Sequence, residues 1–139
     1  DVQVFAVCID ELETAHTRLS RQQVASLLED VAAAAADCFG TNQTLMAYTT
    51  NATLLIATNT ADPMPANRIE IDIQRKLECD VSARFMGEGT GFGVSVGGPI
   101  QPQGKKQQRA KLACNHVIAH AESRALSKQD KSVAGLYRR

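Results

Sequence analysis

Apolar residues along the chain follow two patterns, short continuous runs and helical spacings. The first run, Val2–Ile9 (VQVFAVCI), is rich in β-branched residues and predicts a central strand buried on both faces. Two more runs, Thr44–Tyr48 and Thr53–Ala57, flank the short segment Thr49–Ala52 and predict a β-hairpin. Because both arms are largely apolar, we expect this hairpin in the middle of a sheet. Phe92–Val96 predicts a further strand.

Helical spacing dominates three other segments. A long helix is expected to begin at Arg18 or Ser20 and to end at Gly40, and Ser20 with Gln23 three residues later predicts a capping box. Arg68–Val81 fits both a strand and a helix, and its length and polar composition favour the helix. Lys105–Leu126 predicts a second long helix.

The remaining C-terminal residues are less regular. Gly97, Gly98 and two nearby prolines are expected to end the strand before them, and Lys128–Lys131 predicts a turn. Ser132–Tyr137 predicts a short closing strand or the start of a tail. The element order is then β-α-β-β-α-β-α-β. It predicts an α/β (α+β) fold of the ferredoxin-like palm type, a mixed sheet of about five strands with helices packed on it.

Composition narrows the class of protein. At 139 residues with 44% hydrophobic residues, we expect one globular domain over 1–139. No apolar run reaches the length of a membrane span and no signal peptide is visible, so we expect a cytoplasmic protein. The absence of Trp and the few aromatics make nucleic acid an unlikely partner. The scattered cysteines lack zinc-site spacing and are expected to be buried thiols.

Charge is balanced overall, with 15 basic and 15 acidic residues, but it is unevenly distributed. Residues 104–139 carry nine basic and two acidic side chains. This basic end is either a solvated helix face with a tail or a surface for phosphate or an acidic protein partner.

Several local patterns have both a functional and a structural interpretation. The glycine-rich segment Gly87–Gly93 (GEGTGFG) lacks the context of a phosphate-binding loop and predicts a flexible hairpin or loop. His116 and His120 stand one helical turn apart, as in zinc sites, yet without a matching acid they predict surface or partner contacts. No pattern indicates a serine or cysteine nucleophile.

The element order and three segments together resemble the nucleotide-cyclase palm superfamily. This superfamily includes GGDEF diguanylate cyclases, GTP cyclohydrolase III, minimal CRISPR-polymerase domains and class III cyclases. The matching segments are FAVCIDEL, LMAYTTNATLLIAT and GFGVSVGG, and AKLACNHVIAHAESRAL is similar to the final helix of the family. GTP cyclohydrolase III looks most similar around CFGTNQTLMAYTTNATLLIATN.

The resemblance implies a site with two Mg²⁺ ions, which bind phosphates and activate a 3′-hydroxyl. One carboxylate would come from the end of the first strand, where Asp10 matches and Glu11 follows. The other would come from the hairpin turn, which reads Thr49, Thr50, Asn51 and Ala52 and contains no acid. The family's RxxD product-binding motif is also missing before this turn. Arg75-x-x-Glu78 has a similar spacing elsewhere and predicts a solvated helix pair.

These residues predict a degenerate, non-catalytic cyclase-like domain with no required cofactor. It would act in signalling as a nucleotide- or cyclic-dinucleotide-sensing, dimerisation or partner-binding module. The turn at Thr49, Thr50, Asn51 and Ala52 is its candidate ligand site. One alternative is an active Mg²⁺-dependent cyclase or GTP-hydrolysing enzyme using Asp10, Glu11 and an acid such as Glu13. Another is a protein-binding scaffold that uses the basic C-terminal helix.

Overall fold

The computed structural model describes residues 2–10, 19–40, 43–62, 64–79, 93–102 and 109–137. Its elements, in chain order, are β1 (Val2–Ile9), α2 (Arg21–Phe39), β2 (Thr44–Tyr48), β3 (Leu54–Asn59), α3 (Ala66–Cys79), β4 (Val94–Ile100) and α5 (Arg109–Tyr137). The predicted first strand, the helix after Ser20 and the helical choice for the Arg68 segment are confirmed.

The described strands form one sheet in the order β2-β3-β1-β4, and all three neighbouring pairs are antiparallel. Two crossover units are interleaved, because α2 joins β1 to β2 across β3, and α3 joins β3 to β4 across β1. This is the split arrangement of a ferredoxin-like palm, as predicted. The predicted mixed sheet of about five strands differs in detail, since the described part of the chain has four antiparallel strands.

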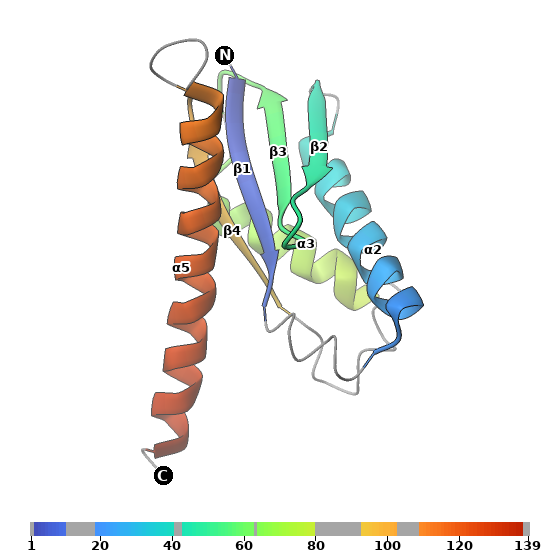
Figure 1. Ribbon diagram of the computed structural model, residues 1–139, viewed down its shortest axis with the longest axis vertical. Helices are drawn as coiled ribbons and strands as arrows, with labels where there is room; N and C mark the ends of the chain where they lie inside the picture. Colours follow the sequence, from blue (N-terminus) through green and yellow to red (C-terminus); the bar gives the residue numbers. More distant parts are fainter. Residues whose placement is uncertain are drawn as a thin grey trace.

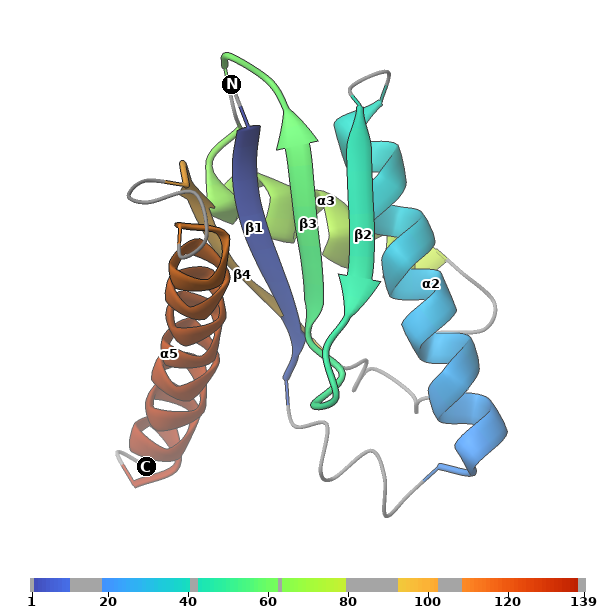
Figure 2. The ribbon, with the colours of Figure 1, turned by 45° about the horizontal axis from the view of Figure 1, so that its top comes forward.

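Helices cover the two faces of the sheet unequally (Figure 1, Figure 2). α2 and α3 pack on one face, where the larger hydrophobic cluster includes Phe5, Ile56 and Ile73. α5 packs on the other face against β1 and β4, with Ala6, Val117 and Ala121 in a second cluster. Among the described elements, the sheet is therefore a middle layer with two helices on one side and one long helix on the other.

The burial of each strand follows from this coverage. β1 is buried from Val4 to Ile9 because helices lie over both of its faces. β3 alternates between buried and half-buried residues, and β2 leaves Leu45 78% exposed. The expectation that the whole hairpin lies centrally was wrong for β2, which forms an edge of the sheet.

The start of α2 shows the predicted capping box. The Ser20 hydroxyl accepts a hydrogen bond from the Gln23 amide at 3.1 Å, and the Gln23 side chain accepts one from the Ser20 amide at 2.9 Å. Val24, Leu27 and Val31 lie on the inner face of this helix and are buried. The local sequence therefore supplies both capping hydrogen bonds at this helix start.

The C-terminal segment differs from the prediction. α5 continues without interruption to Tyr137, so the expected turn at Lys128–Lys131 and the expected strand at Ser132–Tyr137 are both wrong. The residue types of this segment are compatible with a helix. In addition, the Lys128 side chain donates a hydrogen bond to the Val94 carbonyl of the sheet, a contact that the sequence pattern does not reveal. The helix runs well past the end of the sheet (Figure 1).

β4 also extends further than predicted, through Gly97, Gly98 and Pro99 to Ile100. A proline is tolerated there because β4 is an edge strand. At Gly97 an added Cβ would lie 2.3 Å from the Val117 carbonyl oxygen and 2.6 Å from the Ala121 nitrogen. The glycine therefore permits α5 to lie directly against the strand.

The outer edge of β4 is closed by side chains. Its main-chain N–H groups donate to Gln74 from Val94 (3.2 Å), to Glu70 from Val96 (3.0 Å) and to His120 Nδ1 from Gly98 (3.0 Å). Two of these acceptors come from α3 and one comes from α5. These contacts attach α3 and α5 to the strand. They also block strand addition, because an edge strand normally exposes its N–H groups to pairing with another strand.

Among the described residues, no helix is both long enough and apolar enough to cross a membrane.

Candidate functional site

Asp10 follows the last residue of β1 and lies between β1, β4 and α5. Its main-chain N–H donates to the Gly93 carbonyl at 2.8 Å, which continues the β1–β4 pairing by one residue. The Ser95 hydroxyl, on a residue with no exposed surface, donates to Asp10 Oδ1 at 2.6 Å. A short hydrogen bond from a buried hydroxyl fixes the carboxylate orientation.

Two acidic and two basic side chains form a connected cluster at this end of the sheet. Lys128 Nζ lies 3.4 Å from Asp10 Oδ2 and 3.3 Å from Glu70 Oε2. Arg124 Nη2 lies 3.0 Å from both carboxylate oxygens of Glu70. The two acids are largely buried, with side-chain exposures of 17% for Asp10 and 15% for Glu70. Formal charge within the cluster is balanced.

The fit of a magnesium ion can be judged from the donor set. Mg²⁺ requires several hard oxygen ligands, usually carboxylates, in a compact octahedral shell. Both Asp10 oxygens already have partners, Ser95 and Lys128, and Glu70 is paired with two cations. Within the described ranges, no three His, Cys, Asp or Glu side chains are grouped to share a metal. These residues do not fit a two-magnesium centre.

The turn between β2 and β3 is closed by its own hydrogen bonds. The Thr49 hydroxyl accepts from the amides of Asn51 (3.3 Å) and Thr53 (3.2 Å), and the Thr49 carbonyl accepts from Ala52 (3.0 Å). Ala52 has φ of 59°, a conformation that favours glycine. Thr50 and Asn51 are exposed. The Thr49 hydroxyl thus holds the turn, leaving Thr50 and Asn51 as the exposed polar side chains of the four.

Asp10 and the turn lie at the same end of the sheet but engage different neighbours. β1 pairs with β3 up to Val7 and Leu54, and the Cys8 sulfur lies 3.8 Å from the Thr53 hydroxyl oxygen. This contact links β1 to the turn, whereas the Asp10 carboxylate binds to β4 and α5. Asp10 and the turn therefore share one end of the sheet, but the Asp10 carboxylate has partners of its own that the sequence pattern does not reveal.

The cysteines differ in environment rather than being uniformly buried. Cys8 is buried, Cys38 and Cys114 are intermediate, and Cys79 is exposed. Burial raises the pKa of the Cys8 thiol above its ordinary value, opposed in part by the hydrogen bond with Thr53. Burial is also the main cause of the raised pKa of Cys38.

We therefore expect thiol alkylation of the native protein at pH 8 to modify Cys79 first and Cys8 last. The reactive species is the thiolate, and burial disfavours it at Cys8. Peptide mass spectrometry after timed iodoacetamide treatment measures the order, and a urea-denatured sample provides the control in which all four react. Early modification of Cys8 would contradict the packing of β1 against the turn.

Other candidate residues are placed as follows. Glu11, Glu13 and the glycine-rich residues 87–92 lie outside the described residues. Arg75 and Glu78 are both exposed on α3, in agreement with a solvated pair. His116 is exposed, and His120 accepts the hydrogen bond from Gly98. The histidine pair thus includes one residue that stabilises the sheet edge.

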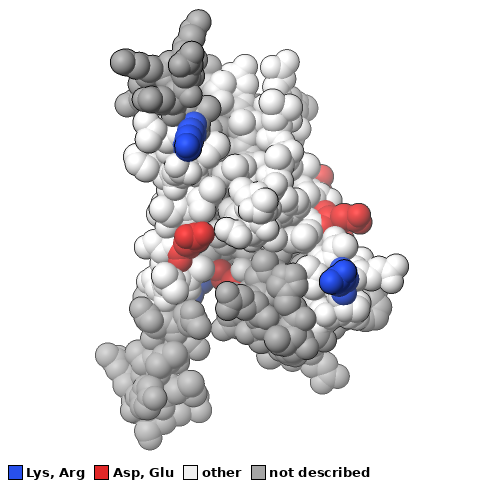
Figure 3. Space-filling model, viewed as in Figure 1, with Lys and Arg blue, Asp and Glu red and all other residues white. Residues whose placement is uncertain are grey.

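On the face shown in Figure 3, the described basic side chains are scattered and do not form one large patch. Arg124 and Lys128 belong to the basic C-terminal region, and both are engaged within the fold. These two cations are therefore less available for contact with an acidic partner.

Sequence reasoning missed Glu70, Ser95, Arg124 and Lys128. A usable signal exists on α5, because Val117, Ala121, Arg124 and Lys128 recur at helical spacing along one face. The buried stripe of this helix therefore continues into two cations. The expected turn at Lys128 concealed this continuity.

No family model and no curated protein sequence matches the chain. Solved structures are similar to it, among them the following three. The dimeric guanylyl cyclase domain of the RhoGC fusion protein from the aquatic fungus Blastocladiella emersonii has a TM-score of 0.50 and 17% identity, over 82% of this chain and 71% of that one. A bacterial light-regulated adenylyl cyclase has a TM-score of 0.47 and 13% identity, over 82% and 38%.

The guanylate cyclase domain of RhGC from Catenaria anguillulae, solved with GTP, has a TM-score of 0.43 and 19% identity, over 76% of this chain and 61% of that one. At such identities the likeness concerns the fold alone. The similarity to the Blastocladiella domain agrees with the topology described above. The chain has the fold of palm-type nucleotide cyclase domains.

Proposed function

We propose that this chain is a degenerate, non-catalytic cyclase-fold domain of the GGDEF-like kind. Its role is to sense a purine nucleotide or cyclic dinucleotide, or to bind a protein partner or second copy, in signalling. The observation that carries the proposal is the β2–β3 turn, which has no acid and is held by the Thr49 hydroxyl. A two-metal reaction at this place requires a carboxylate that the turn does not offer.

The Asp10 side chain supports the same conclusion. Its Oδ1 accepts the Ser95 hydrogen bond and its Oδ2 faces Lys128, so the acid that matches the family position serves as an internal partner. Thr50 and Asn51 remain exposed on the turn, at the same end of the sheet, and are suited to hydrogen bonding with a base or sugar. Binding without turnover is the chemistry that these groups permit.

The purified protein is expected to form no cyclic nucleotide and no pyrophosphate from GTP or ATP with Mg²⁺ or Mn²⁺. Chromatography and a pyrophosphate assay measure both products, and an active diguanylate cyclase domain serves as positive control. Metal-dependent turnover that disappears in Asp10→Ala would overturn the proposal in favour of an active enzyme that uses Asp10, Glu11 and Glu13.

Ligand binding is tested separately by thermal shift with mono-, tri- and cyclic dinucleotides. A ligand that binds only the native state raises the apparent Tm. The rise increases with the ratio of the ligand concentration to Kd. Loss of that shift in Asn51→Ala would assign the turn as the binding site. Absence of any shift, together with salt-sensitive binding of an acidic protein, would instead support the scaffold function.

A further inference from the structure

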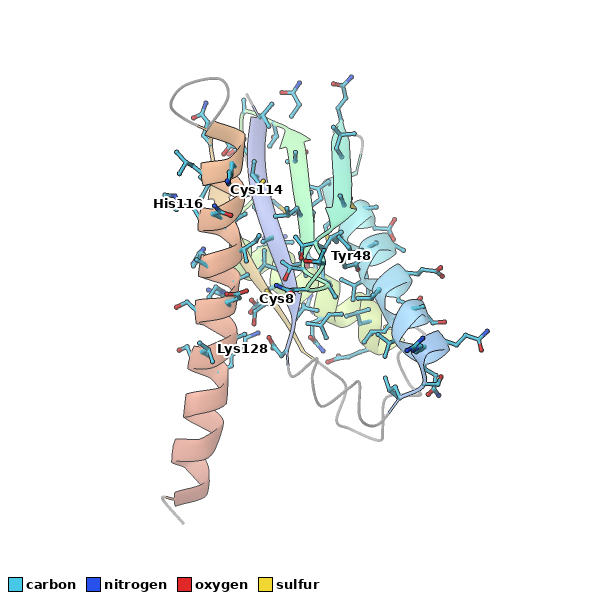
Figure 4. All side chains as sticks on the ribbon, viewed as in Figure 1. Cys8, Tyr48, Cys114, His116 and Lys128 are labelled. Carbon is cyan, nitrogen blue, oxygen red and sulfur yellow. The ribbon has the colours of Figure 1, made fainter. Side chains whose placement is uncertain are left out.

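One ammonium group lies where three separate elements meet. Lys128 Nζ, from α5, donates to the Val94 carbonyl of β4 at 2.7 Å. It also lies 3.4 Å from Asp10 Oδ2 at the end of β1 and 3.3 Å from Glu70 Oε2 on α3. Figure 4 shows the Lys128 side chain on the side of α5 that faces the end of β1. Three oxygens from three elements surround a single positive charge.

The neighbouring contacts hold these oxygens in place. Ser95 binds the other Asp10 oxygen at 2.6 Å, so the carboxylate cannot turn away without losing that bond. Glu70 is held by Arg124 and by the Val96 amide, both at 3.0 Å. Without Lys128 the cluster would carry one net negative charge and keep three oxygens directed at the vacated position.

We propose that Lys128 is a tethered cation that occupies a divalent-metal position formed by Asp10, Glu70 and the Val94 carbonyl. By occupying it, Lys128 closes this position to metal ions. The proposal depends on the geometry of the cluster and does not require that the protein bind a nucleotide. It also assigns α5 a direct role at this end of the sheet, because the blocking charge comes from that helix.

The distances indicate which ion would replace the ammonium group. The oxygens lie 2.7 to 3.4 Å from Nζ, further than the roughly 2.1 Å of a Mg²⁺–oxygen bond. Ca²⁺ accepts longer bonds of about 2.3–2.6 Å and irregular geometry. The oxygens therefore need to move less for Ca²⁺ than for Mg²⁺, and Ca²⁺ should be the preferred ion once Lys128 is removed.

The test is calorimetric titration of the full chain with CaCl₂ and with MgCl₂. The wild type is expected to show no saturable binding in the millimolar range. Lys128→Ala is expected to bind one Ca²⁺ with a Kd on the order of 1 mM or tighter, and to bind Mg²⁺ at least several-fold more weakly. Lys128→Met retains most of the aliphatic stem and serves as a second variant if the alanine variant is poorly folded by circular dichroism.

Three controls separate this site from general charge effects. Lys128→Arg keeps the cation and should gain no binding, and Lys111→Ala removes an exposed lysine of the same helix and should also gain none. Asp10→Asn combined with Lys128→Ala should lose the gained Ca²⁺ site. Folded Lys128 variants that bind no Ca²⁺, or a wild type whose Ca²⁺ binding is lost in Asp10→Asn, would each overturn the proposal.

Discussion

Gly97→Ala is expected to destabilise the protein by about 3 kcal/mol, at the upper end of overpacking effects. The new Cβ would meet the Val117 carbonyl oxygen at 2.3 Å and the Ala121 nitrogen at 2.6 Å. Both are main-chain atoms of α5, so no side-chain rotation relieves the contact. The helix has to move away from β4, which separates Val117 and Ala121 from the second hydrophobic cluster.

Urea denaturation followed by circular dichroism measures this loss, and hydrogen exchange of α5 amides shows whether the helix has detached. Ala119→Ser, an exposed change on the same helix, is the control and should alter stability by less than about 0.5 kcal/mol. A Gly97→Ala protein as stable as wild type would mean that α5 does not pack on β4 as described.

Glu70→Ala is expected to cost about 2–3 kcal/mol of unfolding free energy. It leaves the Val96 N–H without its acceptor at the edge of β4, and it removes the carboxylate that Arg124 and Lys128 share. Removing one member of a partly buried network is costly because the remaining groups lose their compensation. Solvent access to the two cations keeps the figure below that of a fully buried pair.

Two substitutions test the cause of this loss. Glu70→Gln keeps an oxygen for the Val96 N–H and should cost only about 1 kcal/mol of unfolding free energy. This cost measures the contribution of the Glu70 charge alone. Asp37→Ala removes the exposed ion pair with Lys76, and its effect should stay within about 0.5 kcal/mol. Equal effects of the alanine substitutions at Glu70 and Asp37 would show that the edge contacts contribute little.

Much of the fold could be predicted because strong local signals agreed with the tertiary structure. The continuous apolar run Val2–Ile9 and the Ser20 capping box are both observed with their predicted limits. β4 was predicted too short because Gly97 and Pro99 normally end strands. In this protein Gly97 is required because α5 lies close to the strand, and Pro99 is tolerated because β4 is an edge strand. Both explanations depend on the tertiary structure, which the local sequence does not show.

The candidate site was predictable only in part. A strand end directs attention to Asp10, and the hairpin pattern locates the turn from Thr49 to Ala52. The partners of Asp10 come from residues 85 and 118 positions further along the chain, Ser95 and Lys128. The helical spacing on α5 can place Lys128 on the inner face of that helix, but it does not specify Asp10 as the partner. The length of α5 was the missing information, because ending it before Lys128 removed the ammonium group from the site.

The closed edge of β4 also limits how this protein can assemble. The sheet has two outer strands, and in β4 the amides of Val94, Val96 and Gly98 are already bound to side chains. If two copies joined through their β2 strands, the continuous sheet would end in a β4 strand on each side. Polymerisation by strand addition would then terminate at the dimer, since neither growing end could accept a third copy.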